Sequence, residues 1–280
     1  MRYASVSIAK PGQGQVNEDA ALAERGRIAV SDGAGGGGVY ADKWSQYLLK
    51  RLPKEPVTTF AELDGWIDTI WETFANEYEQ KAKKAGPIVL NKFYDEGSFA
   101  TLAAAWATDK GAWRWMTYGD SVVFIYSRRT GELRHSPIHL ADFNSAPLLI
   151  SLRDKLVENA FNAGEWQTEA GDILFCATDA LSHYVMMMYE LSRPDEFKDE
   201  LGEALSAGTR NTALIQAALD YCKGKDFNGE VVRKLVACME DSANSKVRCN
   251  CFFQKYMEAK LRRRIVALDD YSYAMMDLKR

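Results

Sequence analysis

The chain has 280 residues, enough to bury a large hydrophobic core within a single domain spanning residues 1–280. Hydrophobic residues make up 47% of it and charged residues 26%, as in soluble globular proteins. The formal net charge of −4 argues against a nucleic-acid-binding protein, because such proteins present a basic face to the phosphate backbone. We therefore expect a small-molecule or peptide ligand and no nucleic-acid partner.

The first residues, Met1-Arg-Tyr-Ala-Ser-Val6, lack the long apolar core of a signal peptide. No apolar run approaches the ~18 residues that a membrane-spanning helix needs. These features predict a cytoplasmic protein with no membrane partner. The sequence leaves the oligomeric state open.

Short strands and amphipathic helices occupy separate stretches of the sequence. From residue 97 onwards, strands recur every ~8 to 12 residues with turn residues between them, which predicts an antiparallel sheet rather than strand–helix–strand units. Strands are expected at 2–9, 20–23, 28–30, 97–106, 113–118, 122–126, 132–135, 173–178 and 271–276. Apolar spacings of three and four predict helices at 40–52, 60–84, 182–189, 195–205, 211–223 and 229–239. Residues 87–95 are interpreted as a break and 138–163 as a surface excursion.

The stretch after the expected strand at 28–30 contains Asp32 and then almost only glycine up to Gly38. A surface turn is one interpretation of it. A dinucleotide-binding loop is another, because Gly33 to Gly38 fits G-x-G-x-x-G between a strand and a helix. Against this, Asp32 would direct a carboxylate at a pyrophosphate, and 53–59 is a poor second parallel strand. The third interpretation makes Asp32 a metal ligand, with glycines that leave room for the metal and a phosphate.

Several aspartates share one property: each lies at the end of an expected strand or just before one. They are Asp19, Asp32, Asp179, and Asp269 or Asp270. Carboxylates gathered at a sheet edge repel one another unless a cation neutralises them. Hard oxygen ligands with few histidines favour magnesium or manganese over zinc. Two such ions activate a water and bind a phosphoryl oxygen, so this pattern points to metal-assisted phosphoester hydrolysis.

Six short motifs occur in the order typical of one enzyme family. They are Asn17-Glu-Asp19, Asp32-Gly-Ala-Gly-Gly36, Gly97-Ser-Phe-Ala-Thr101, Gly119-Asp-Ser121, Ala177-Thr-Asp179 and Asp269-Asp-Tyr-Ser272. In these motifs, over nearly its whole length, the chain resembles the metal-dependent (PPM, type 2C) protein serine/threonine phosphatases. The resemblance implies an α+β fold, a four-layer α-β-β-α sandwich of two packed antiparallel sheets flanked by helices. It also implies two Mn²⁺ or Mg²⁺ ions at one edge of the sandwich.

The resemblance assigns metal ligands by position. Asp32 would bridge the two metals, with the Gly33 carbonyl as a further ligand. Asp179 and Asp269 would complete the shell of the second metal.

Two neighbouring carboxylates, Glu18 and Asp19, would act largely through bound waters in the same family pattern. Asp120 belongs to a turn motif and is expected to be structural. The expected catalytic residues are Asp19, Asp32 and Asp179.

The chain departs from the family pattern at the phosphate-binding arginine. Members usually carry it five residues before the aspartate of the first motif, and Gly14 stands there in this chain. Losing a guanidinium removes both charge and bidentate geometry from phosphate recognition. Arg25 or Arg27 is a possible replacement.

A second departure is His183, in the stretch Asp179-Ala-Leu-Ser-His183, where many members have an aspartate that helps to bind an additional metal. A third metal is therefore not expected. We interpret His183 as a surface residue at the start of a helix, with a role as general acid or ligand as the alternative.

These observations predict a metal-dependent phosphatase that hydrolyses phosphoserine or phosphothreonine on a protein by means of a metal-activated water. The alternative is a non-catalytic protein of the same fold that binds phosphoproteins or partner proteins. The absent arginine favours this alternative, and the retained carboxylates argue against it. The irregular segment 138–163 is a candidate for substrate selection.

Overall fold

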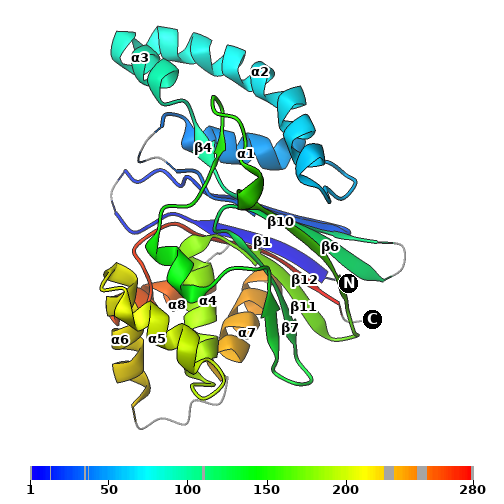
Figure 1. Ribbon diagram of the computed structural model, residues 1–280, viewed down its shortest axis with the longest axis vertical. Coiled ribbons are helices and arrows are strands. Elements are labelled where there is room, and N and C mark those ends of the chain that lie inside the picture. Colours follow the sequence, from blue (N-terminus) through cyan, green and yellow to red (C-terminus); the bar gives the residue numbers. More distant parts are fainter. Residues whose placement is uncertain are drawn as a thin grey trace.

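The computed structural model describes residues 2–12, 14–34, 36, 38–108, 111–223, 230–244 and 251–278. Its centre consists of two five-stranded antiparallel sheets (Figure 1). The first sheet has the order β1 (Arg2–Ile8), β12 (Tyr271–Asp277), β11 (Asp172–Ala177), β7 (Val122–Ser127), β8 (Leu133–His135). The second has the order β10 (Phe161–Gln167), β6 (Ala112–Tyr118), β5 (Leu102–Ala107), β3 (Arg27–Ser31), β2 (Ala20–Glu24). A short ladder pairs β4 (Phe99–Ala100) with β9 (Ile150–Ser151).

Helices cover the outer face of each sheet (Figure 1). The second sheet carries α1 (Ala41–Arg51) and α2 (Phe60–Ala85), with α3 (Pro87–Asp95) packed on α2. The first sheet carries α4 (Asp179–Leu191), α5 (Lys198–Ser206), α6 (Arg210–Cys222), α7 (Glu230–Asn244) and α8 (Cys251–Arg262). Two 3₁₀ turns, η1 (Leu140–Asn144) and η2 (Glu158–Ala160), interrupt the connection between the sheets.

Three hydrophobic cores separate the four layers, and strand alternation supplies them. Along β11, Phe175 points to the helices on the first sheet, whereas Leu174 and Cys176 point to the space between the sheets. Along β3, Ile28 joins the core between the sheets and Ala29 faces α1. Because successive side chains of a strand point to opposite faces, a strand buried on both faces has no polar side and reads as a continuous apolar run. Two packed sheets with helices on both outer faces confirm the expected four-layer sandwich.

Most of the expected elements form, and the exceptions have local causes. The interpretation of 87–95 as a break is wrong, because Pro87 occupies the first turn of α3, where a missing N–H costs nothing. The segment 138–163 was expected to be irregular throughout, but its last residues begin β10, which pairs along its length with β6. The helix expected at 229–239 begins at the edge of the described residues and runs to Asn244.

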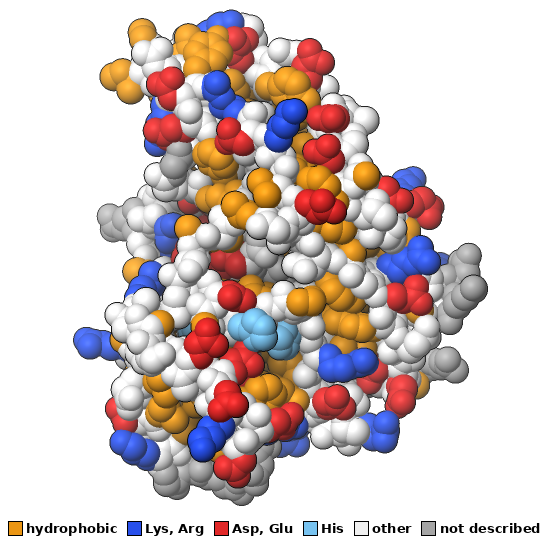
Figure 2. All heavy atoms as spheres, in the orientation of Figure 1, with side chains coloured by type: hydrophobic (Ala, Val, Ile, Leu, Met, Phe, Trp, Pro, Cys, Tyr) orange, Lys and Arg blue, Asp and Glu red, His pale blue; other side chains and the backbone are white. Residues whose placement is uncertain are grey.

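Within the described residues, no helix combines the length and the apolar composition that crossing a membrane requires. On the face drawn in Figure 2, the described Lys and Arg side chains are dispersed among Asp and Glu.

A truncation in the core between the sheets tests this layer assignment. Leu174 is fully buried there, so Leu174→Ala should lower the free energy of unfolding by about 3 kcal/mol. Ile88→Ala is the control, because Ile88 on α3 is 85% exposed, and its effect should stay within about 0.5 kcal/mol. Urea unfolding of both variants measures the difference, and equal losses would contradict the assignment.

Candidate metal centre

Asp32 follows β3 at the edge of the second sheet, and its backbone is fixed from both sides. The Thr101 N–H donates to the Asp32 carbonyl at 2.8 Å, and the Asp32 N–H donates to the Thr101 hydroxyl at 3.2 Å. The same hydroxyl lies 2.6 Å from the Ser121 hydroxyl, which follows the Gly119-Asp120 turn before β7. These contacts join the edges of the two sheets beside the Asp32 carboxylate.

Gly33 allows two chain segments to meet next to Asp32. Its N–H donates to the Glu18 carbonyl at 3.2 Å. A Cβ at this position would lie 2.6 Å from the carbonyl oxygens of both Glu18 and Ala41. Only glycine fits between these backbones, and its presence brings Glu18 close to Asp32.

Asp179 is the first residue of α4, directly after β11 and Thr178. The Thr178 hydroxyl donates to Asp19 Oδ2 at 2.9 Å and accepts from the Ser272 N–H at 3.1 Å. Asp19 is only 4% exposed. These contacts tie the first motif to β11 and β12 and hold Asp19 behind the site rather than in its wall.

Asp269 and Asp270, which the strand pattern alone does not separate, have different environments. The two carboxylate oxygens of Asp270 accept from the backbone N–H groups of Lys10 and Glu18, each at 2.7 Å. Asp270 therefore fixes the backbone, whereas Asp269 lines the site.

These segments surround a cavity of about 280 Å³. Five of the six predicted metal ligands line this cavity, and the sixth, Asp19, lies just behind them. The lining residues are Lys10, Glu18, Asp32, Gly33, Ala34, Gly36, Thr101, Asp120, Pro147, Leu149, Asp179 and Asp269. Pro147 and Leu149 come from the segment 138–163, so part of that segment lies at the site.

Asp120 belongs to the same wall, although the sequence suggested a purely structural role for it. Its Oδ1 atom is buried and has no hydrogen-bond partner among the described residues. The signal was present in the Gly119-Asp-Ser121 motif, but the motif alone does not say that its turn lies against Thr101, the residue that contacts the Asp32 backbone.

The carboxyl groups raise one another's pKa. Burial is the largest cause for each, and the negative charges of the neighbouring aspartates add to it. The pKa of Asp19 rises to about 8 and that of Asp179 to about 6. The pKa values of Asp32 and Asp120 rise well above the usual range of a carboxyl group. A cation in the cavity would relieve this cost.

The donor set fits a hard divalent cation. Carboxylate oxygens and the Gly33 carbonyl are ligands that Mg²⁺ and Mn²⁺ prefer. No group of three or more carboxylate, imidazole or thiolate side chains in the described part of the chain is arranged to enclose an ion.

Solved structures of bacterial serine/threonine phosphatases share this architecture. The PstP catalytic domain, determined in complex with two manganese ions, has a TM-score of 0.54 and 18% identity, covering 100% of this chain and 98% of that one. PstP/Ppp from Mycobacterium tuberculosis has a TM-score of 0.53 and 18% identity, and the match covers 100% of this chain and 99% of that one. Stp1 from Staphylococcus aureus has a TM-score of 0.53 and 11% identity, and the match covers 100% of this chain and 96% of that one.

This chain has the PPM phosphatase fold. No family model matches it, and no curated protein sequence does. At such low identities the similarity establishes the PPM fold alone, and the chemistry has to be argued from the residues of this chain.

The suggestion that Arg25 or Arg27 replaces the usual phosphate-binding arginine is wrong. The Arg27 guanidinium donates to the carbonyls of Leu52 and Pro53, at 2.6 and 2.8 Å. Arg25 lies in the turn that precedes Arg27, and the length of β3 separates both from Asp32. A cation does line the cavity: Lys10 Nζ lies 3.9 Å from Glu18 and 4.0 Å from Asp269.

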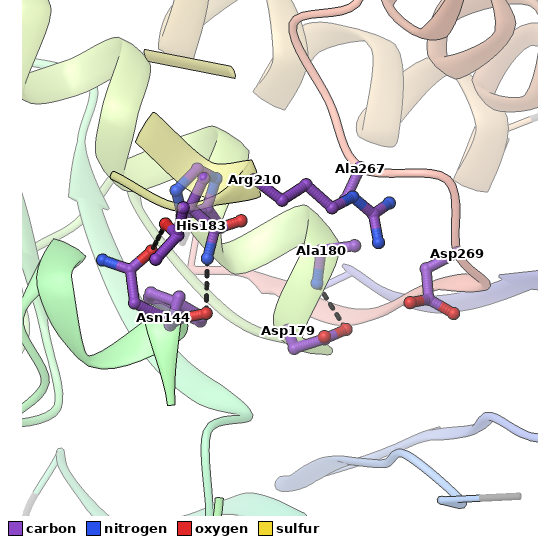
Figure 3. A pocket seen from close by; sticks show the side chains of 10 residues that line it. Asn144, Asp179, Ala180, His183, Arg210, Ala267 and Asp269 are labelled. Carbon is purple, nitrogen blue, oxygen red and sulfur yellow. Dashed lines mark hydrogen bonds between the residues drawn. The ribbon is translucent and has the colours of Figure 1, made fainter. Parts of the chain in front are cut away.

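His183 is not the surface residue that the sequence suggested. It is 3% exposed, because nearly every residue of α4 is covered by neighbouring elements. Burial lowers the pKa of His183 to about 4, so the ring is neutral. It does not line the acidic cavity and lies in a neighbouring pocket, where Figure 3 shows it close to Asn144.

The close approach at Gly33 gives a direct test of how the site is assembled. Gly33→Ala should lower the free energy of unfolding by about 1–3 kcal/mol, because the new methyl meets backbone on two sides. Gly36→Ala is the matched control, since a Cβ there meets nothing within 4 Å. Urea unfolding compares the two, and equal stability would show that the Glu18 and Ala41 backbones move apart freely.

The raised pKa values predict how metal binding depends on pH. Because Asp19 and Asp179 keep protons that an unfolded aspartate releases near pH ~3.9, the metal-free protein should lose stability as the pH rises from about 4 to 8. A bound cation favours the ionised carboxylates and offsets this loss. Mn²⁺ should therefore raise the melting temperature, relative to EDTA, more at pH 8 than at pH 5.5.

Scanning calorimetry of the wild type and Asp179→Asn measures this dependence. The variant should show a weaker dependence, and Asp220→Asn, at an exposed carboxylate of α6, should behave as the wild type does. If Mn²⁺ raised the melting temperature of the wild type equally at pH 5.5 and at pH 8, the account would be contradicted.

Proposed function

We propose that residues 1–280 form a single metal-dependent protein phosphatase domain that hydrolyses phosphoserine and phosphothreonine on proteins. The observation that carries this proposal is the meeting of half-buried carboxylates from separate segments at one edge of two packed sheets. Asp32, Asp120, Asp179 and Asp269 line one cavity, and nothing in the hydrophobic cores requires them to be there. The PPM fold supports the same conclusion.

Two Mn²⁺ or Mg²⁺ ions are the cofactors of this proposal. Asp32 would contact both, the Gly33 carbonyl and Glu18 would face one, and Asp179 and Asp269 would face the other. Asp19, held by Thr178, and Asp120, with its unpartnered oxygen, would bind waters of the metal shells. When bound, such ions lower the pKa of water and polarise phosphoryl oxygens.

In this proposal, the chain's own residues orient the phosphate monoester. Lys10 places an ammonium group beside Glu18 and Asp269, where it would contact a phosphoryl oxygen. Hydrolysis joins a water oxygen to phosphorus and breaks the P–O ester bond, and the serine or threonine oxygen leaves with a proton from solvent. The Thr101 hydroxyl in the cavity wall already contacts Asp32 N–H and Ser121, so we expect no phosphoenzyme.

Removal of the bridging carboxylate tests this function. Hydrolysis of p-nitrophenyl phosphate and of a phosphothreonine peptide by the wild type should require Mn²⁺ or Mg²⁺ and stop with EDTA. Asp32→Ala should lower kcat/KM at least about 100-fold, which corresponds to about 2.7 kcal/mol of transition-state stabilisation. Asp220→Ala, at an exposed aspartate of α6, is the control and should keep full activity.

Two results would count against the enzyme. Unchanged turnover in Asp32→Ala would refute the site. Metal binding by calorimetry without any turnover in the wild type would favour the non-catalytic binding protein, the alternative that Gly14 in place of an arginine supports.

A further inference from the structure

A second pocket, of about 210 Å³, lies beside the acidic cavity and shares Asp179 and Asp269 with it. Its other walls come from η1, from α4 and from the start of α6. Figure 3 shows His183 and Asn144 at one end of this pocket and Arg210 reaching toward Asp269 at the other. A group that enters it is therefore next to the proposed phosphate site.

Asn144 lines this pocket and has one unused hydrogen-bond donor. Its side-chain oxygen accepts from the Thr209 hydroxyl, which fixes the orientation of the amide. The amide nitrogen is then left buried, with no partner among the described residues. A buried donor without a partner costs free energy, and a ligand that accepts hydrogen bonds would offset this cost.

His183 adds a second group of the same kind. Its side chain is 3% exposed, and neither ring nitrogen has a hydrogen-bond partner among the described residues. A neutral imidazole carries one N–H donor. The nearby ring of Phe143 meets it edge-on and satisfies neither nitrogen.

Arg210 supplies a positive charge at the other end. Within the described part of the chain it forms no ion pair, and its hydrogen bond to the Leu268 carbonyl is long, at 3.4 Å. It is the first residue of the 13-residue helix α6, whose N-terminus adds a partial positive charge. The pocket thus combines a guanidinium that makes one long hydrogen bond with two side chains, Asn144 and His183, that carry unpartnered nitrogen atoms.

We propose that this pocket is a subsite for a second anionic group of the substrate, a carboxylate or a phosphate on a residue near the phosphorylated one. Arg210 pairs with the anion, and Asn144 and His183 donate hydrogen bonds to it. The inference rests on the proposed function, because Asp179 and Asp269 repel an anion until metal ions neutralise them. The enzyme then prefers phosphorylation sites in acidic or doubly phosphorylated segments.

Direct binding tests the subsite independently of turnover. The probes are peptides with a non-hydrolysable phosphonate analogue of phosphothreonine, carrying alanine, glutamate or a second phosphonate at each position from −3 to +3. With Mn²⁺, fluorescence anisotropy should show about tenfold tighter binding of an anionic peptide than of its alanine counterpart at one position. A preference for glutamate identifies a carboxylate subsite, and a preference for the second phosphonate alone identifies a phosphate subsite.

Variants assign the preference to this pocket. Arg210→Ala should reduce the ratio of the two affinities to about one, and Arg210→Lys should restore part of it. Asn144→Asp keeps an acceptor for Thr209 but replaces the donor by a charge, so it should also reduce the ratio. Arg129→Ala, at an exposed ion pair with Glu169, should keep the full ratio. Equal melting temperatures would show that the variants fold.

The outcomes separate the two proposals. No anionic preference in the wild type, or a preference that survives Arg210→Ala, would overturn the subsite. A preference that depends on Arg210 in a protein that hydrolyses no phosphopeptide would support the subsite and refute the phosphatase function.

Discussion

Mutual repulsion of buried carboxylates is the constraint on which this structure depends. Asp19, Asp32 and Asp179 are brought together in a part of the protein where burial raises the pKa of each. Side-chain and backbone contacts hold them there, among them the two hydrogen bonds that Asp270 accepts from backbone N–H groups and the one that Thr178 donates to Asp19. A fold keeps such an arrangement only if other interactions stabilise it, and the three hydrophobic cores between the four layers do so.

The layers also explain why the site lies where it does. Alternation along β3 and β11 fixes these strands between two cores, so their ends cannot shift without moving apolar side chains out of place. Asp32 directly follows the end of β3, and Asp179 follows the end of β11 after one residue, Thr178. The helices on the first sheet then add what the sheets lack: the start of α6 and η1 close a pocket with a guanidinium and an amide beside the carboxylates. The proposed anion subsite is thus built largely by the helix layer, and it shares Asp179 and Asp269 with the cavity at the sheet edges.

Much of this arrangement could be predicted from the sequence, because a buried strand followed by an aspartate is a local pattern. The β10 strand was missed because an edge strand, half exposed, carries no clear alternation: Phe-Asn-Ala-Gly-Glu-Trp-Gln. His183 was misplaced because the elements that bury α4, such as η1 and α7, come from distant parts of the chain. The same reason applies to Asp120 and Arg210, whose roles depend on which turns pack against which helix ends. Local patterns predict elements, whereas long-range packing decides which side chains share a cavity.

The most direct test of the central claim is the location of bound metal in a crystal grown with Mn²⁺. An anomalous difference map should contain two peaks in the cavity of Asp32, Asp179 and Asp269, about 3.5–4 Å apart and both next to Asp32. Peaks elsewhere on the surface, or an empty cavity in crystals of protein that is saturated with Mn²⁺, would contradict the account.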